Sequence, residues 1–173
     1  MLAPGGRMVP RPHRCLKIDR SKGTWMNQQR VLLGRCLCGA ITVELRGAPG
    51  PLMFCHCAQC RRSSGAAALA VLPIAARDFH LGDPEGVLRG YEASPGKSRH
   101  FCGRCGSPVY SRRDGDATVR VRAGLLDLPA DIPRGGHIFC ASAAPWDDAR
   151  DDLPRHARYE PGRAHLDQER NGK

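Results

Sequence analysis

The sequence predicts a small, mostly β domain with short antiparallel strands and few or no helices. Aromatic residues make up 5% of the chain, whereas glycine (20) and proline (14) are plentiful, which is typical of short strands joined by many turns. Several segments alternate apolar and polar residues, and no segment has a convincing helical period. At 173 residues the chain has room for one domain with its own core plus tails.

The strand predictions run along the chain in order. Within residues 40–45, five successive side chains alternate between apolar and polar, and residues 52–57 form a short apolar segment that runs into cysteines. A hairpin is expected within 107–126, around Asp114-Gly115-Asp116, because a glycine flanked by aspartates favours a tight turn. Further strands are predicted within 67–82 (interrupted by Pro73), 86–93 and 135–142.

The composition divides the chain into three parts. Residues 1–29 are rich in proline and arginine and lack hydrophobic periodicity, so we expect a disordered extension or a mis-assigned start of translation. The domain itself is predicted over 30–162, and residues 163–173 are expected to form a frayed polar tail.

The net charge of +10 does not by itself predict nucleic-acid binding. Residues 1–25 contain six Lys/Arg and one Asp, so half of the excess belongs to the N-terminal extension. The remaining charge is spread through mixed stretches such as "RRDGDATVRVR", which we interpret as solvated surface, and we do not expect nucleic acid as a partner.

The longest apolar run (66–76) is too short to span a membrane and there is no secretion signal, so we expect no membrane partner and a cytoplasmic location.

Nine cysteines carry most of the functional information, and seven of them form three spaced groups. These groups are Cys36-x-Cys38, Cys55-x-Cys57-x2-Cys60 and Cys102-x2-Cys105. Such groups in a reducing compartment indicate metal binding, since C-x2-C lets two sulfurs reach one ion and C-x-C on an extended segment projects both sulfurs to one face.

Spacing alone leaves the pairing of these groups open. Cys57 and Cys60 could join Cys102 and Cys105 in one site, or Cys36 and Cys38 could do so and leave Cys55, Cys57 and Cys60 as a set of three. Either way, seven cysteines cannot fill two closed four-cysteine sites, so one site has a different ligand or an open position.

Four other residues receive structural expectations. His56 lies between two candidate ligands and should point the other way, into a hydrogen bond or solvent. Cys140 is expected to act as a small core residue, and Phe139 and Trp146 are also expected in the core.

The segments "GRCLCGAITVEL", "FCHCAQCRRSSG", "YEASPGKSRHFCGRCGSPVY" and "HIFCASAAPWDD" occur in the order seen in one known family. They resemble the glutathione-dependent formaldehyde-activating enzymes (GFA), a family that includes centromere protein V-like proteins. The resemblance implies a β-tent fold and two zinc ions. It assigns a structural zinc to Cys36, Cys38, Cys102 and Cys105, and a second, catalytic zinc to Cys55, Cys57 and Cys60.

The resemblance also implies an activity, that of a carbon–sulfur lyase that reversibly adds a thiol to a small aldehyde. For the founding activity the thiol is glutathione and the aldehyde is formaldehyde. A zinc site with three thiolates and one open position suits thiol exchange, because the ion stabilises a substrate thiolate at neutral pH. Arg61 is a candidate to pair with a substrate carboxylate, and His137 is a candidate to handle a proton.

Two other functions compete with the enzyme hypothesis. One is a non-catalytic zinc-binding interaction module, and the other is a thiol-based redox or metal sensor. A pocket beside Cys55 and Cys60 would favour the enzyme, whereas a sealed second site would favour the module. The expected partners are a small thiol and an aldehyde, and formation of a homodimer is left open.

Overall fold

The protein folds into two β-sheets, and the computed structural model describes residues 31–163. The smaller sheet has the strand order β1-β2-β5, and its strands are β1 (Val31–Arg35), β2 (Thr42–Arg46) and β5 (Phe79–Gly82). The larger sheet has the order β10-β3-β4-β9-β8-β7-β6. Its strands are β3 (Leu52–Cys55), β4 (Leu69–Ala75), β6 (Leu88–Ser94), β7 (Lys97–Cys102), β8 (Pro108–Arg113), β9 (Thr118–Arg122) and β10 (Arg134–Ile138).

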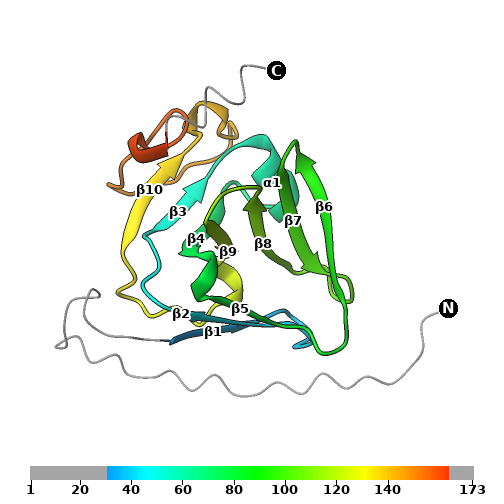
Figure 1. Ribbon diagram of the computed structural model, residues 1–173. Helices are drawn as coiled ribbons and strands as arrows, with labels where there is room; N and C mark the ends of the chain where they lie inside the picture. Colours follow the sequence, from blue (N-terminus) through cyan, green and yellow to red (C-terminus); the bar gives the residue numbers. More distant parts are fainter. Residues whose placement is uncertain (1–30, 164–173) are drawn as a thin grey trace.

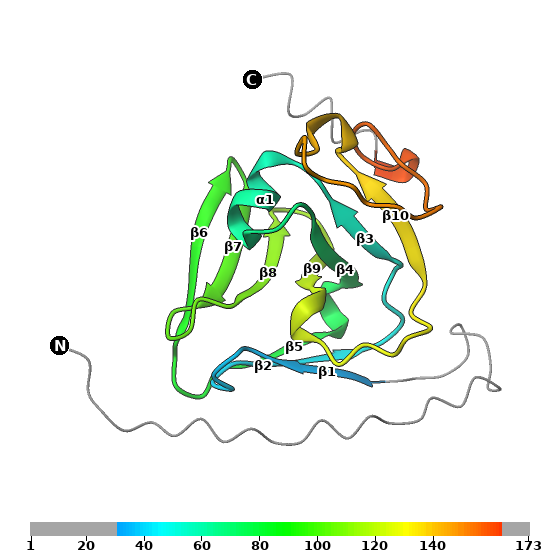
Figure 2. The same ribbon diagram turned by 180° about the vertical axis from the view of Figure 1, so that it is seen from behind.

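The two sheets give the molecule a tent-like outline. The three-stranded sheet lies across the base, and the seven-stranded sheet arches above it from β10 on one side to β6 on the other (Figure 1 and Figure 2). The predicted mostly β fold is confirmed. Neighbouring strands pair antiparallel, as predicted, except that β10 runs parallel to β3. The predicted hairpin is present, with β8 and β9 joined through the turn that contains Gly115.

The described residues form one α-helix, α1 (Ala58–Ser64), in a region without a convincing helical period. With seven residues it is too short to show periodicity, and local capping defines it instead. The Cys57 sulfur accepts a hydrogen bond from the Cys60 amide at the N-terminus, and Gly65 ends the helix in the left-handed conformation with φ +69°. Short 3-10 turns lie at η2 (Ala76–Asp78), η3 (Ala123–Leu125), η4 (Cys140–Ser142) and η5 (Pro161–Arg163).

The main core lies between the two sheets. Ile41 and Leu45 on the smaller sheet side, and Leu72 and Val121 on the larger, are fully buried there. Because side chains alternate across a strand, the neighbours of Leu72 and Val121 point to the opposite face of the large sheet. That second face carries the candidate site.

Some local predictions hold and others are wrong. Phe139 is buried, as predicted, whereas Trp146 is 67% exposed and is not a core residue. Cys140 is only half-buried. The strand predicted over 135–142 ends at Ile138, because Phe139 adopts a left-handed conformation (φ 59°) that turns the chain into η4.

Other predictions lie partly or wholly outside the described residues. These are the N-terminal extension and most of the C-terminal tail. Within 31–163 no helix is long and apolar enough to cross a membrane.

Candidate metal centres and the adjoining cavity

The first thiol cluster joins the two sheets. Cys36 and Cys38 lie in the turn between β1 and β2, and Cys102 and Cys105 lie at the turn between β7 and β8. Their four sulfur atoms all lie within 4.8 Å of one another. The Sγ–Sγ distances are 3.5 Å for Cys36–Cys38 and 3.8 Å for Cys38–Cys102. Tetrahedral zinc with Zn–S bonds of about 2.3 Å needs sulfurs roughly 3.8 Å apart, so this cluster fits a metal ion.

Hydrogen bonds shift the pKa values of the thiols in this cluster. The amide of Ile41 donates to the Cys36 sulfur at 3.3 Å. Burial raises the pKa of Cys105, but hydrogen bonds with Ser107, Cys38 and Cys102 together outweigh it and lower that pKa to about 5. A backbone hydrogen bond with Ala40 lowers the pKa of Cys38, but burial and the neighbouring thiols outweigh it and raise that pKa to about 11. The contacts therefore favour a thiolate at Cys105, and metal ligation requires all four thiols in this form.

The second cluster contains Cys55, Cys57 and Cys60, which come from the end of β3 and the start of α1. The helical turn that Cys57 caps brings Cys60 back beside it, and the three sulfurs lie within 4.8 Å of one another. Among the described residues no further Cys, His, Asp or Glu joins this group. Three converging sulfurs fit one metal ion with a fourth position left for another ligand.

Arg99 from β7 is the charged neighbour of this trio. Its Nη2 lies 3.5 Å from the Cys60 sulfur, and its Nη1 donates to Ser63 Oγ at 3.0 Å. The neighbouring thiols of Cys55 and Cys57, and then the Arg99 guanidinium, lower the pKa of Cys60. The arrangement therefore favours negative charge at Cys60, whereas hydrogen bonds with Cys57 and Cys60, together with burial, raise the pKa of Cys55.

The trio opens onto a cavity with a small inner chamber of about 40 Å³. Its wall joins Cys55, Cys57 and Cys60 to apolar side chains such as Val71 and Ile138. No aspartate or glutamate of the described part of the chain lines this chamber. The cationic residues in its wall are Lys97, Arg99, Arg112, Arg113, Arg120, Arg122 and Arg163.

Strand register brings most of these cations together. Arg99 on β7 pairs with Ser111 on β8, and Ser111 pairs with Arg120 on β9, so all three share one face of the large sheet. Arg122 lies two residues beyond Arg120 and therefore on the same face. The interpretation of "RRDGDATVRVR" as solvated surface holds for the exposed turn around Asp114 but is wrong for 118–122, whose valines enter the core while Arg120 and Arg122 face the cavity.

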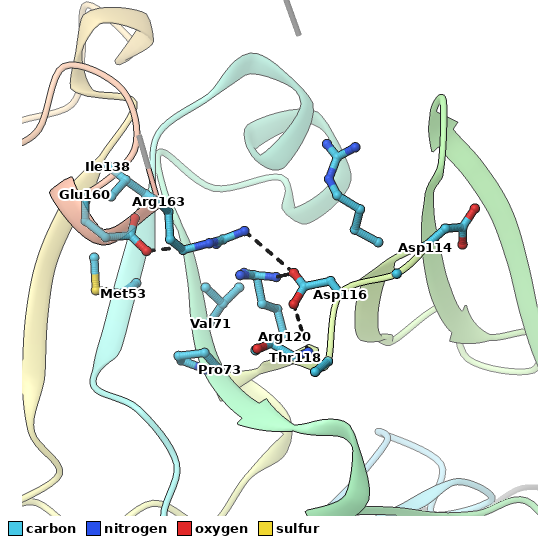
Figure 3. A pocket seen from close by; sticks show the side chains of 13 residues that line it. Met53, Val71, Pro73, Asp114, Asp116, Thr118, Arg120, Ile138, Glu160 and Arg163 are labelled. Atoms are coloured by element: carbon cyan, nitrogen blue, oxygen red, sulfur yellow. Dashed lines mark hydrogen bonds and ion pairs between the residues drawn. The ribbon is translucent and has the colours of Figure 1, made fainter. Parts of the chain in front are cut away.

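An outer chamber of about 590 Å³ adjoins the inner one and shares Arg113, Arg120 and Arg163 with it. In Figure 3, Arg120 and Arg163 approach Asp116 from two sides. The ion-pair distances are 3.1 Å for Arg120–Asp116 and 3.8 Å for Arg163–Asp116. Glu160 lies 3.9 Å from Arg163, and its Oε2 is buried without a hydrogen-bond partner.

The two buried histidines and two aspartates form a chain of polar contacts. His56 Nε2 lies 2.7 Å from His137 Nδ1, His56 Nδ1 lies 2.5 Å from an Asp147 oxygen, and His137 Nε2 lies 3.0 Å from Asp151. His56 thus turns away from the sulfurs into hydrogen bonds, as the strand alternation predicts. His137 is 3% exposed and does not line the inner chamber.

Arg61 also lies outside the cavity wall. Its guanidinium donates to the backbone oxygens of His56 and Ser142, both at 3.3 Å, and so ties α1 to η4. The cation that contacts the trio is Arg99, which the sequence analysis did not single out. The "KSRHFC" segment could have indicated this residue. In it Lys97 and Arg99 lie on one face of a strand that ends at the ligand cysteine Cys102.

Comparison with known protein families identifies a match that includes both thiol clusters. Residues 31–142, more than half of the chain, match the family model described as glutathione-dependent formaldehyde-activating enzyme. The chain belongs to this GFA family. This GFA member thus has two thiol clusters that fit metal ions. The matched segment contains all seven of the clustered cysteines.

Among solved structures, a Rhodobacter sphaeroides protein is similar to this GFA member at 22% sequence identity. The similarity covers 59% of this chain and 98% of that one, with a TM-score of 0.48. No curated protein matches the chain.

Proposed function

We propose that this GFA member is a zinc-dependent carbon–sulfur lyase that reversibly adds a glutathione-like thiol to a small aldehyde. The observation that carries the proposal is that the trio of Cys55, Cys57 and Cys60 opens onto a cavity rather than being sealed by a protein side chain. A catalytic metal site keeps one position for substrate, whereas a structural site is closed. Zinc is proposed for both clusters, with two ions per chain.

The residues around the trio suit this chemistry. A bound zinc ion would supply a Lewis acid that keeps a substrate thiol deprotonated at neutral pH. Arg99 balances part of the negative charge at Cys60, and its bond to Ser63 fixes its position. Val71, Ile138 and Phe139 form an apolar wall that limits water beside the reacting atoms.

The outer chamber supports a peptide-like thiol. Glutathione has two carboxylates and one ammonium group, and the chamber offers Arg113 and Arg163 to the former. The buried and unpartnered Oε2 of Glu160 is an acceptor for the latter. A volume of about 590 Å³ falls within the usual range of pockets for small molecules.

The test is exchange NMR with the purified, zinc-loaded protein. Glutathione and ¹³C-formaldehyde form an S-hydroxymethyl adduct slowly on their own, and we expect the protein to accelerate the exchange between free and adduct carbon. Cys60→Ala removes a ligand of the trio and should abolish this acceleration while the fold is retained.

Two outcomes would contradict the proposal. One is a protein with two zinc ions that accelerates no thiol–aldehyde pair, which would favour the interaction module. The other is a Cys60→Ala variant as active as the parent. Reversible zinc release by peroxide without any lyase activity would favour the sensor.

A further inference from the structure

The inner chamber contains buried cations that no carboxylate neutralises. Arg99 is 4% exposed and Arg122 is 5% exposed, and neither forms an ion pair with a described aspartate or glutamate. Arg122 donates only a long hydrogen bond to Ser111 Oγ (3.4 Å), and its Nε is buried without a partner. Buried guanidinium groups without an anion are costly, so this arrangement points to an anionic ligand.

The trio does not supply enough negative charge for these cations. Three thiolates around a divalent ion have a net charge of about −1. Facing this charge in the same chamber are Lys97, Arg99 and Arg122. Because Arg99 already contacts Cys60, the other two remain for an anion from outside the protein.

The size of the chamber determines which substrate brings that anion. The inner chamber of about 40 Å³ has room for a group of a few atoms, whereas the outer chamber of about 590 Å³ can hold a tripeptide. The carboxylates of a glutathione-like thiol therefore fall beside Arg113 and Arg163, which lie where the two chambers meet. The anion at Arg122 must belong to the smaller, carbonyl substrate.

We propose that the carbonyl substrate is a short acidic aldehyde of the glyoxylate type, whose carboxylate is held by Arg122 and Lys97 beside the thiol trio. This inference rests on the proposed function and names the substrate class of the same site. In the reaction the thiol sulfur bonds to the aldehyde carbon, the C=O π bond breaks, and the thiol proton ends on the new hydroxyl. The product is a 2-hydroxy-2-thioether carboxylate, and no oxidant or reductant is needed.

The first test measures binding without chemistry. Glycolate has the carboxylate but no aldehyde, and glycolamide is its neutral counterpart of nearly the same shape. Isothermal titration calorimetry on the zinc-loaded protein should show glycolate binding at least about 10-fold more tightly than glycolamide, as expected for charge-assisted hydrogen bonds. Equal affinities would overturn the inference.

Variants locate the anion within the chamber. Arg122→Met keeps an unbranched apolar stem but removes the guanidinium, and it should weaken glycolate binding by about 10- to 100-fold. Arg134→Met is the matched control, because the exposed Arg134 lines neither chamber and its loss should leave glycolate binding unchanged. If Arg122→Met does not fold, Lys97→Met tests the same subsite. Unchanged glycolate binding in a folded Arg122→Met or Lys97→Met variant would overturn the inference.

Turnover separates this inference from the proposed function. With glutathione as thiol, the protein should accelerate adduct exchange more for glyoxylate than for methylglyoxal, in which a neutral acetyl group replaces the carboxylate. Acceleration with formaldehyde but no preference for glyoxylate would overturn the inference and leave the lyase proposal intact. Tight, Arg122-dependent glycolate binding without any turnover would contradict the lyase proposal and support the anion subsite.

Discussion

Arg122 shows how a single residue can serve binding at the expense of stability. Its guanidinium lies among β-strands, and burial lowers its pKa to about 10, with the nearby charge of Arg99 adding to the effect. Nothing in the described chain neutralises it. A side chain in this position stabilises the folded protein less than an apolar one of equal size would.

Replacing this charge should therefore not destabilise the protein. For Arg122→Met we expect the free energy of unfolding to stay the same or rise by up to about 3 kcal/mol, because a desolvated charge is removed and the packing is kept. Urea denaturation of the zinc-loaded protein measures this. The exposed Arg134→Met serves as a control and should change stability by less than about 0.5 kcal/mol. A large loss of stability in Arg122→Met would show that the guanidinium is structurally required.

Lys97 gives the proposed anion subsite a pH dependence. Burial lowers its pKa to about 8; the Cys60 and Cys55 sulfurs act in the opposite direction, and Arg99 and Arg120 lower it further. The ammonium is present below pH 8 and is lost as the pH rises above it. Glycolate affinity should thus fall between about pH 7 and about pH 9. Titration calorimetry at both pH values checks this, and Lys97→Met should remove most of the difference.

Some secondary-structure elements could be predicted from the sequence and others could not. The β8–β9 hairpin was predictable because Asp114-Gly115-Asp116 specifies its turn locally. The seven-residue α1 was not, because its definition depends on a sulfur cap at Cys57 and a left-handed Gly65 rather than on a hydrophobic period. The cationic wall was not predicted either, since Arg99 and Arg120 come together only through the register of β7, β8 and β9.

Gly65 offers a test of how far α1 positions the trio. A Cβ at this position meets no atom within 4 Å, so any cost of Gly65→Ala comes from its positive φ alone. We expect a loss of about 1 kcal/mol in unfolding free energy and weaker metal binding at the trio. Asparagine tolerates this conformation, so Gly65→Asn should lose less. Chemical denaturation and metal competition titrations measure the two effects, and equal losses in both variants would contradict the backbone explanation.

For the whole molecule the two thiol clusters have different structural roles. Cys36 and Cys38 belong to the smaller sheet, whereas Cys102 and Cys105 belong to the larger, so a metal held by all four joins the sheets. The trio, in contrast, lies within one short segment that runs from the end of β3 into α1. Spacing left two pairings open, and only the three-dimensional placement of β7 beside the β1–β2 turn separates them.

This difference predicts different outcomes for two alanine variants. Cys102→Ala should unfold the domain, because a structural zinc contributes directly to folding free energy. Cys60→Ala should stay folded and lose one metal ion per chain. Circular dichroism together with metal analysis distinguishes the two. If Cys60→Ala unfolded as completely as Cys102→Ala, the division of roles would be wrong.

Residues after the family match contribute to the surroundings of the thiol trio. The match stops at residue 142, yet Asp147 and Asp151 contact the two buried histidines, and Arg163 lines both chambers of the cavity. A chain trimmed at the matched boundary would retain all seven clustered cysteines but lose these aspartates and this part of the cavity wall. The folded unit that surrounds the cavity therefore reaches beyond the matched segment, to residue 163.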